Sequence, residues 1–397
     1  MTAHATRAKE LVTAASVAVC RVERLRLHRF RNYAETTVRF GARINVISGR
    51  NAQGKTNLLE ALATLALTRS PRSPSNAHLV QWGSDQCLAE ATVSRPAHNT
   101  VIALRLTRDP DSDHVSRSVT VDGKPRAARA MLGICPVVLF WPEDLTLVKG
   151  GPDARRRLLD VLLAQTDHRV SAHLVRYRRV LEQRNALLHQ MRAGAGGADE
   201  LASFTRELAH HGAEILIARA RLVAALTPLA ASALDTLSDG REQLRLTYAT
   251  SHGDKVLPDG GAEAAETSLL DALQARAGEE IARGVTVIGP HRDDVDIELD
   301  GRPARSSASQ GQQRSIVLAL KLAEVRHIHD VSGIAPVILL DDVLSELDPP
   351  RRATLLEMLS AAVPHQIIIT TTDAATTTAG GRDARHFTVS AGSVEET

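Results

Sequence analysis

The chain has 397 residues, of which 43% are hydrophobic and 24% are charged, and its formal net charge is +2 at pH 7. These values are ordinary for a soluble globular protein of roughly two to three domain-sized units, and the charge balance by itself does not indicate a polyanionic partner. Cys20, Cys87 and Cys135 lie far apart and form no C-x-x-C pair. This spacing disfavours a zinc site or a disulfide framework and fits a reducing compartment.

The first segment of the chain, residues 1–20, matches no functional pattern. Arg7 and Lys9 precede an apolar stretch at 11–19, which weakly resembles a signal peptide. Because the following segment predicts a site that consumes ATP, we reject a signal peptide and interpret residues 1–20 as an extended or misassigned start that is poorly ordered. No apolar run approaches the ~18 residues that a membrane span requires.

Residues 21–30 predict a strand with one basic face. Leu25 and Leu27 alternate with Arg24, Arg26 and His28, so that apolar and polar side chains point to opposite faces. A turn and a second strand pattern at 36–40 follow and lead into a glycine-bounded loop.

Residues 44–61 predict a phosphate-binding loop between a strand and a helix. An apolar, β-branched run precedes a stretch that fits G-x-x-x-x-G-K-[ST], and leucines at helical spacing follow it. The glycines let backbone N–H groups surround an anion, which also meets the positive end of the new helix. The lysine reaches the outer phosphates, and the threonine holds Mg²⁺. The predicted ATP-binding residues are Gly49, Arg50, Asn51, Ala52, Gln53, Gly54, Lys55 and Thr56.

The rest of the sequence alternates between strand and helix patterns around a helical middle. Strand patterns lie at residues 88–93, 101–106, 119–124 (a hairpin), 137–140, 285–288, 295–299, 337–340 and 366–370. Helical periodicity covers 153–165, 168–191, 198–239, 314–329 and 351–362, and residues 258–266 predict a loop. We therefore expect an α/β fold in which one ATPase head is assembled from residues 21–150 and 284–397, with a mainly helical lobe inserted at 151–283.

Asp341 and Asp342 directly follow the apolar strand pattern at 337–340. A parallel strand beside a phosphate loop brings its carboxyl end to the nucleotide. We expect Asp341 to hold Mg²⁺ through water and Asp342 to polarise the attacking water. Alone, this pattern is equally typical of a core strand with a polar end, but the phosphate loop upstream favours the functional interpretation.

A second anion site is predicted at Ser309-Gln-Gly-Gln-Gln, which opens the helix pattern that follows. Ser309 occupies an N-cap position, which is also the structural interpretation of the motif. Capping alone does not require the glycine and glutamines, whereas Gly311 would let a phosphate approach the helix N-terminus. We expect Ser309, Gly311 and Gln312 to bind the triphosphate held by a second copy of the chain, so that ATP joins two subunits.

Five elements of the sequence resemble the RecF family of DNA replication and repair ATPases, which are relatives of ABC-type and SMC-type heads. In family order they lie at residues 27–33, 49–57, 147–157, 289–294 and, as one pair, 309–313 with 341–348. The resemblance covers nearly the whole chain from about residue 21. It implies an ABC-type head of two lobes that dimerises on ATP, hydrolyses it slowly, binds DNA and acts with mediator proteins to place recombinase at single-strand gaps.

The resemblance also assigns roles to individual residues. Thr56 and Asp341 would hold Mg²⁺, and Asp342 would assist hydrolysis. Ser309 and Gly311 would cap the γ-phosphate bound by the other chain, and Asp348 would lie at the interface between the two chains. Two departures from the family pattern leave open how the γ-phosphate is sensed. No glutamine stands near Pro142 and Glu143, and threonines at 370–372 replace a histidine after the last core strand.

The sequence predicts the DNA-binding residues less clearly than the ATP-binding residues. The predicted phosphate-binding arginines are Arg155, Arg156, Arg157, Arg176 and Arg179, with Arg178 and Arg184 as further candidates. A solvated helix face is the alternative for any one of them. Because aromatic residues make up only 3% of the chain, a stacking platform is poorly supplied, and we expect salt-sensitive backbone contacts with little sequence preference. The implied setting is cytoplasmic and nucleoid-associated, with DNA, mediator proteins and a second copy as partners, and no membrane.

Two other functions share parts of this pattern. The ATPase subunit of a membrane transporter has the same two-chain ATP site, but the Leu-Ser-Gly-Gly-Gln motif of that class is absent from this sequence. A non-catalytic clamp would use ATP only to lock a dimer on DNA. A metabolic kinase or GTPase fits poorly, because Asn-Lys-x-Asp is absent.

Overall fold

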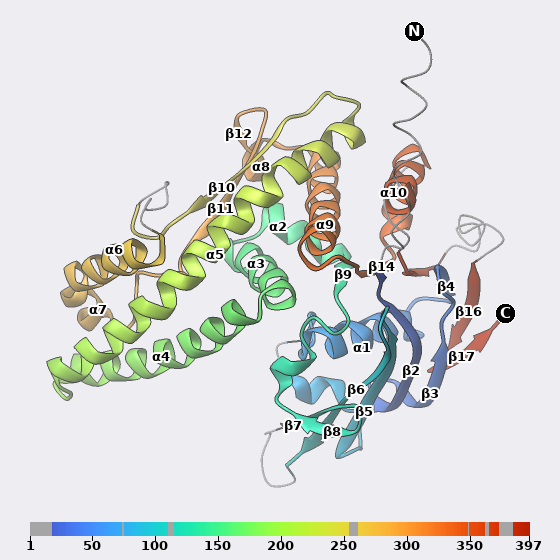
Figure 1. The fold of residues 1–397 in the computed structure, drawn as a ribbon, viewed down its shortest axis with the longest axis horizontal. Coiled ribbons are helices and arrows are strands. Elements are labelled where there is room, and N and C mark those ends of the chain that lie inside the picture. Colours follow the sequence, from blue (N-terminus) through green and yellow to red (C-terminus); the bar gives the residue numbers. More distant parts are fainter. Residues whose placement is uncertain are drawn as a thin grey trace. The chain divides into compact units, whose positions relative to one another are not determined.

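The computed structural model describes residues 18–73, 75–109, 115–253, 261–347, 349–361, 365–372 and 384–397. The chain divides into two compact units (Figure 1). The first unit, which we call the head, is built from both ends of the chain, Met1–Leu139 and Ile328–Thr397. The second, which we call the lobe, is Phe140–His327 and is wider than the helical stretch at 151–283. The predicted α/β unit assembled from both chain ends is confirmed.

The first sheet of the head is mainly parallel and joins the two ends of the chain. Its six strands run in the order β17 (Ser393–Glu396), β16 (Arg385–Ser390), β4 (Ile44–Ser48), β15 (Ile367–Thr371), β14 (Val337–Asp341) and β9 (Val137–Phe140). β4 is parallel to both β15 and β16, and β15 is parallel to β14. Strands buried on both faces read as continuous apolar runs, which is the pattern of β14 and β15.

The second sheet of the head is antiparallel. Its order is β3 (Tyr33–Arg39), β2 (Arg21–Phe30), β5 (Gln86–Ser94), β6 (Asn99–Arg108), β7 (Val115–Val121) and β8 (Lys124–Arg126). Leu25 and Leu27 of β2 are fully buried, whereas Arg24, Arg26 and His28 are not, as the alternation predicted. β1 (Ala18–Val19) pairs with β13 (Ile334–Ala335), so residues 18–20 belong to the fold. The rest of the predicted extension, residues 1–17, lies outside the described residues.

The two sheets of the head enclose helix α1 (Lys55–Leu67), which begins at the phosphate loop. α1 packs against β2, β5 and β6 on one side and against β14 and β15 on the other. Every residue from 58 to 67 is buried, as expected for a helix that is covered all round. Gln366 also ties the sheets together, because its side-chain amide accepts from Val22 N at 2.7 Å and donates to the carbonyls of Val22 and Gly41. Short helices η1 (Asn76–Leu79), η2 (Ala128–Met131) and η4 (Val343–Glu346) and helix α10 (Pro349–Ala361) complete the described head.

Long helices dominate the lobe. The helices are η3 (Pro142–Leu145), α2 (Thr146–Lys149), α3 (Pro152–Thr166), α4 (His168–Arg192), α5 (Ala198–Ser238), α6 (Gly261–Ala275), α7 (Ala277–Arg283), α8 (Ala304–Ser307) and α9 (Gln310–Ser332), the last of which ends in the head. A three-stranded sheet of β10 (Leu244–Ala249), β11 (Asp294–Leu299) and β12 (Arg302–Pro303) packs against α5. The main core cluster joins α4, α5 and α6 through side chains such as Tyr177, Ile215 and Leu269.

Two sequence predictions in the lobe are wrong. Residues 285–288 do not form a strand, because side chains rather than a neighbouring strand bind their backbone: Asn185 Oδ1 accepts from Thr286 N, and Glu280 Oε1 accepts from Val287 N. The loop predicted at 258–266 is already helix α6 from Gly261 onward, since Ala265 and Leu269 face the core at helical spacing. Residues 258–260 lie outside the described part of the chain.

Helix α5 also departs from expectation. An 18-residue window of α5 is apolar enough, by length and composition, to cross a membrane, so the prediction that no apolar run approaches this length is wrong. Half of that window is buried inside the protein, where α5 packs against α4 and α6. Core packing therefore accounts for its apolar character.

Candidate functional site

The phosphate loop adopts a strained backbone that glycine makes accessible. Gly49 and Gly54 have φ values of 151° and 119°, and Ala52 between them has 64°. A Cβ atom on Gly49 would lie 2.5 Å from the carbonyl oxygen of Val389, and one on Gly54 would lie 2.5 Å from Asn32 Nδ2. The glycines are therefore needed both for the turn and for the close approach of neighbouring chain segments.

Lys55 folds its ammonium group back over this loop. Its Nζ donates to the carbonyl oxygens of Gly49 at 2.7 Å and Arg50 at 2.9 Å, and the residue is only 7% exposed. Desolvation lowers the pKa of Lys55, whereas the nearby carboxylates of Asp342 and Asp341 act in the opposite direction. The cation is thus held at the place where the outer phosphates of a nucleotide are expected.

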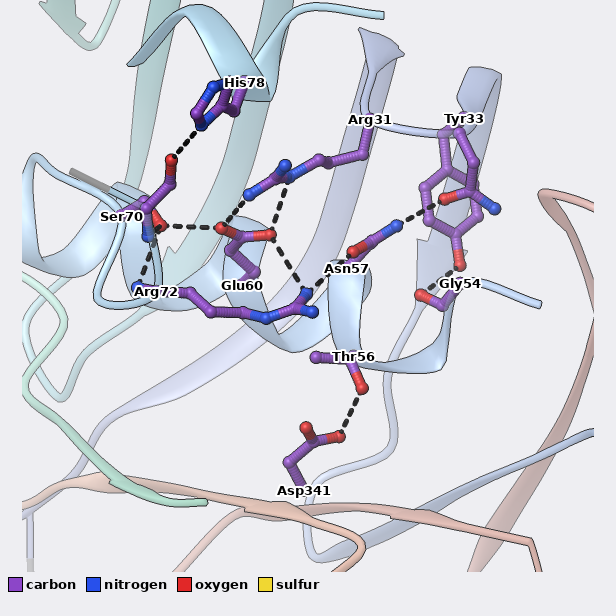
Figure 2. Close-up of polar contacts among 12 residues, drawn as sticks. Arg31, Tyr33, Gly54, Thr56, Asn57, Glu60, Ser70, Arg72, His78 and Asp341 are labelled. Carbon is purple, nitrogen blue, oxygen red and sulfur yellow. Dashed lines mark hydrogen bonds and ion pairs between the residues drawn. The ribbon is translucent and has the colours of Figure 1, made fainter. Parts of the chain in front are cut away.

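Thr56 and Asp341 meet at the carboxyl end of the parallel sheet, as predicted (Figure 2). The Thr56 hydroxyl donates to Asp341 Oδ1 at 2.9 Å, and Thr370 Oγ1 donates to the same oxygen at 2.7 Å. Burial raises the pKa of Asp341, and the hydrogen bonds from Thr370 and Thr56 act against that shift. A hydroxyl beside a carboxylate is a donor set that fits Mg²⁺, which prefers oxygen ligands.

Asp342 is held in a backbone conformation that is rare for a residue with a side chain. Its φ is 54°, and its N–H donates to Thr370 Oγ1 at 3.0 Å. Among the described residues, buried Asp342 Oδ1 has no hydrogen-bond partner. Because a buried polar atom without a partner is costly, this oxygen suits an added water or other donor.

A series of hydrogen-bonded side chains from β3, the turn that precedes it and α1 supports the phosphate loop. Tyr33 OH donates to the carbonyl oxygen of Gly54 at 2.9 Å, and Asn32 Nδ2 donates to that of Gln53 at 2.8 Å. Asn57 Nδ2 in turn donates to Asn32 Oδ1 at 2.8 Å. Burial raises the pKa of Tyr33, so its hydroxyl stays a donor.

Glu60 anchors the other end of this series. It is fully buried and accepts a two-point contact from Arg31, at 2.9 and 2.7 Å, and a third hydrogen bond from Ser70 at 2.6 Å. Arg72 lies 3.8 Å from Glu60 and donates to Asn57 Oδ1 at 3.4 Å, which links the two groups (Figure 2).

Ser309 caps helix α9, as its position predicted. Gln312 N donates to Ser309 Oγ at 3.3 Å, and Ser309 N donates back to Gln312 Oε1 at 2.8 Å, which is a reciprocal capping box. Ser309 is exposed, and Gly311 and Gln312 are half-buried. Asp348, the remaining predicted contact, lies outside the described residues.

The predicted DNA-binding arginines separate into two groups. Arg155 is buried, grips both carboxylate oxygens of Asp294 at 2.7 and 2.9 Å, and donates to two backbone carbonyls. Arg184 is also buried, against Glu280. These two serve the packing of the lobe, which argues against their role as DNA contacts. Arg156 is half-buried and binds Asp153 and the carbonyl of Asp293, whereas Arg157, Arg176 and Arg179 are exposed on α3 and α4.

Sequence reasoning missed several residues around the nucleotide site. Thr370, Glu60 and Arg72 were not predicted as site residues. Thr370 contacts Asp341 and Asp342, and Glu60 is linked to Asn57, beside Thr56, through Arg72. One available signal for Glu60 was a charged residue in the first turns of an otherwise apolar helix, since buried charges require partners.

Fold and site together define the class of the protein. A phosphate loop with a parallel sheet, an antiparallel sheet and an inserted lobe is the arrangement of ABC/SMC-type ATPase heads, and the sequence model described as the RecF/RecN/SMC N terminal domain matches residues 21–393. A solved Smc head domain from Pyrococcus furiosus shares the fold, with a TM-score of 0.53 over 96% of each chain at 16% identity.

More similar relatives specify the family. The DNA replication and repair protein RecF of Synechococcus sp. (strain JA-3-3Ab) is 43% identical over 345 residues, which cover 85% of this chain and 88% of that protein. The protein of the same name from Symbiobacterium thermophilum is 40% identical over 373 residues, or 93% and 96%. A solved structure described as the recombination mediator protein RecF-ATP in the RecFOR pathway matches with a TM-score of 0.85 and 29% identity, over 96% and 98%. The chain belongs to the RecF family, as its motifs predicted.

Proposed function

We propose that this chain is an ATP-dependent DNA-binding protein of recombinational repair and replication restart. ATP joins two copies, the dimer binds gapped or junction DNA, and mediator proteins use the complex to load recombinase. Weak, DNA-dependent hydrolysis then releases it. The observation that carries the proposal is the phosphate loop with Thr56 beside Asp341, in a chain of the RecF family. The name of the relatives and the RecF structure described with ATP support the repair and ATP parts.

ATP binding rests on residues 49–56. In this proposal the Lys55 ammonium leaves the loop carbonyls of Gly49 and Arg50 and turns to the β- and γ-phosphates. The backbone N–H groups of the loop and the N-terminus of α1 bind the remaining phosphate oxygens. Tyr33 and Asn32 keep the loop in its binding conformation by holding the carbonyls of Gly54 and Gln53.

Mg²⁺ and hydrolysis rest on the end of β14. Thr56 and Asp341 would hold Mg²⁺, which would neutralise charge on the phosphates when bound. Asp342 would orient the attacking water, because its Oδ1 is buried and has no partner among the described residues. Thr370 is a positioning residue in this proposal, since it binds both Asp341 and the backbone of Asp342.

The dimer rests on the start of α9. Ser309, Gly311 and Gln312 open a helix of 23 residues, whose N-terminus favours an anion. In the proposed dimer these residues meet the γ-phosphate held by the other copy, with Asp348 at the seam. Ser309 is exposed, so its hydroxyl is accessible to such a partner.

DNA binding rests on the exposed arginines of the lobe. Arg157, Arg176 and Arg179, together with half-buried Arg156, would contact the phosphate backbone. Such contacts carry little sequence information, and binding should weaken steeply with added salt.

Sedimentation of the full chain tests the shared site directly. With saturating ATP and Mg²⁺ the sedimentation coefficient should rise to that of a dimer, and gapped DNA should co-sediment. Ser309→Arg should stay monomeric, because its bulk would occupy the place of the γ-phosphate. Ser309→Ala is the comparison variant: it loses the cap, at a cost of about 1 kcal/mol, and the hydroxyl contact with the γ-phosphate, but it leaves room for the nucleotide and should dimerise more weakly than the wild type rather than not at all. A wild-type chain that remains monomeric with ATP bound would refute the shared site.

Lys55→Arg separates ATP binding from turnover. The charge is kept but the point contact is displaced, so turnover should fall while ATP binding is largely retained. If hydrolysis in this variant equals that of the wild type, the assigned phosphate loop is wrong.

Asp342→Asn tests the clamp alternative. If this variant abolishes turnover yet leaves DNA release unchanged, ATP acts only to lock the dimer on DNA.

A further inference from the structure

Three histidines gather where α4 packs against α5 in the lobe. His173 lies on α4, and His210 and His211 are neighbours on α5. His173 Nδ1 is 3.1 Å from His211 Nδ1, and one ring nitrogen from each of the three lies within 4.8 Å of the others. The ring centroids form a nearly equilateral triangle, with sides of 5.1, 5.1 and 6.0 Å.

This spacing suits one shared metal ion. Zn²⁺ binds imidazole nitrogen at about 2.0–2.1 Å, so two nitrogens on a tetrahedral ion lie about 3.3 Å apart. The 3.1 Å between His173 and His211 is close to that separation, and small rotations of the exposed His210 ring would bring in a third nitrogen.

Carboxylates already stand behind two of the rings. Glu266 of α6 lies 2.9 Å from His210 Nδ1, which leaves Nε2 of that ring for a metal. Glu207 Oε1 lies 4.0 Å from His211 Nε2, on the side away from the Nδ1 that faces His173. Histidine ligands of metals usually bond through their second nitrogen to such a carboxylate, which fixes the tautomer and the ring orientation.

The charges around the cluster also fit a cation. Arg176 adds one positive charge nearby, and the carboxylates of Glu207 and Glu266 offset it.

The helices that carry these ligands are firmly packed. Gly212, next to His211, allows α6 to approach α5 closely, because a Cβ there would lie 2.7 Å from Leu269 Cδ2. The core cluster of Tyr177, Leu208 and Leu269 lies beside the histidines and joins α4, α5 and α6. The site therefore sits on rigid elements, which favours a defined coordination geometry.

We propose that His173, His210 and His211 bind one divalent transition-metal ion of the Zn²⁺ class, and that this ion fastens α4 to α5 within the lobe. Three imidazoles select Zn²⁺, Co²⁺ or Ni²⁺ over Mg²⁺, which prefers oxygen ligands. The fourth position remains for water, as in sites with three protein ligands. This site uses no residue of the proposed nucleotide site.

The test is metal titration of the full-length, untagged chain without nucleotide. Isothermal titration with Zn²⁺ should give one site per chain, and Co²⁺ should give the visible absorption of a tetrahedral ion. Zn²⁺ should also raise the melting temperature, because the preformed site exists only in the folded state. Omitting nucleotide keeps this result independent of the proposed ATP and DNA functions.

Variants assign the site to its residues. His210→Gln changes an exposed ring, so the variant is expected to fold. It should weaken Zn²⁺ binding by a larger factor than the loss of a carboxylate that bonds a ligand, which costs about 10- to 100-fold. Glu266→Gln should fall within that smaller range. His189→Gln is the matched control. His189 is exposed and lies on α4, the helix of His173, about 24 Å along its axis from that residue, so this variant should bind Zn²⁺ like the wild type.

Two results would overturn the proposal. One is a wild-type chain without a stoichiometric Zn²⁺ site. The other is a triple variant of His173, His210 and His211 to Gln that keeps the wild-type affinity and the tetrahedral Co²⁺ spectrum.

Discussion

Glu60 in the head and Glu280 in the lobe are both fully buried carboxylates paired with arginine. Glu280 lies 2.6 Å from Arg184, whose side chain is 1% exposed. Arg184 also binds Thr205 and Thr286, so this network is closed to water on all sides. Glu60 instead meets Arg31 and Arg72, whose side chains are 22% and 42% exposed.

The difference shows how one type of contact serves two purposes. The closed network of the lobe joins α4, α5 and α7 and, among the described residues, has no hydrogen bond to the phosphate loop or to Asp341. The open network of the head holds two cations against one buried carboxylate and continues through Asn57 and Asn32 to the phosphate loop. We infer that Glu280 contributes mainly to stability, whereas Glu60 contributes to the order of the loop as well.

The largest expected effect is on the closed network. Glu280→Gln keeps the shape of the side chain but leaves the Arg184 charge buried without a counter-ion. We expect the free energy of unfolding of the lobe to fall by about 3–5 kcal/mol. Hydrogen exchange of α4 and α7 measures this. Replacing both residues by apolar ones should cost less than the single change, and a double variant that is less stable than Glu280→Gln would contradict this account.

Acid should destabilise the lobe through His291. Its Nδ1 lies 2.7 Å from Tyr177 OH and its Nε2 lies 3.1 Å from the Thr286 carbonyl oxygen, and burial lowers the pKa of His291 to about 4. The unfolded chain takes up this proton first as the pH falls, so the free energy of unfolding should decrease from about pH 6.5 down to about pH 4, by about 3 kcal/mol in total.

His291→Gln should remove this part of the pH dependence. Urea denaturation at a series of pH values measures the slope in both proteins. An unchanged slope in the variant would show that His291 is not the group responsible.

A smaller stability effect but a larger functional effect is expected for Glu60→Gln. Arg31 and Arg72 can turn to water, so the cost should be about 1–2 kcal/mol. If the variant also loses about 1 kcal/mol of the free energy that holds the phosphate loop in its binding conformation, ATP affinity should fall about fivefold. Glu280→Gln should leave ATP affinity unchanged. Titration with ATP measures both variants, and equal affinities would remove the distinction between the two networks.

The smallest expected effect belongs to Tyr33→Phe. The variant loses the hydrogen bond to the Gly54 carbonyl oxygen, which is worth about 1 kcal/mol. ATP affinity should weaken a few-fold, and hydrogen exchange of the loop should quicken. If the loop exchanges at the wild-type rate, Tyr33 does not support it.

The sequence alone predicted the features that depend on contiguous residues. The phosphate loop, its strand and its helix follow each other in the chain, so the pattern at 44–61 specified the local structure. The pairing of Thr56 with Asp341 was also predictable, because the carboxyl ends of parallel strands meet at one edge of a sheet. The absence of a strand at 285–288 was not, because the apolar pattern cannot show that side chains of Asn185 and Glu280 bind that backbone.

Only the tertiary structure decided which distant residues meet. β15 lies between β4 and β14, and this order places Thr370 on Asp341, although nothing in the local sequence specifies strand order. The same holds for Glu60 with Arg31, which are 29 residues apart in the chain, and for His173 with His211, which are joined by the packing of α4 against α5. Local sequence determines backbone propensity and pattern, whereas packing over long separations determines which polar side chains share a buried space.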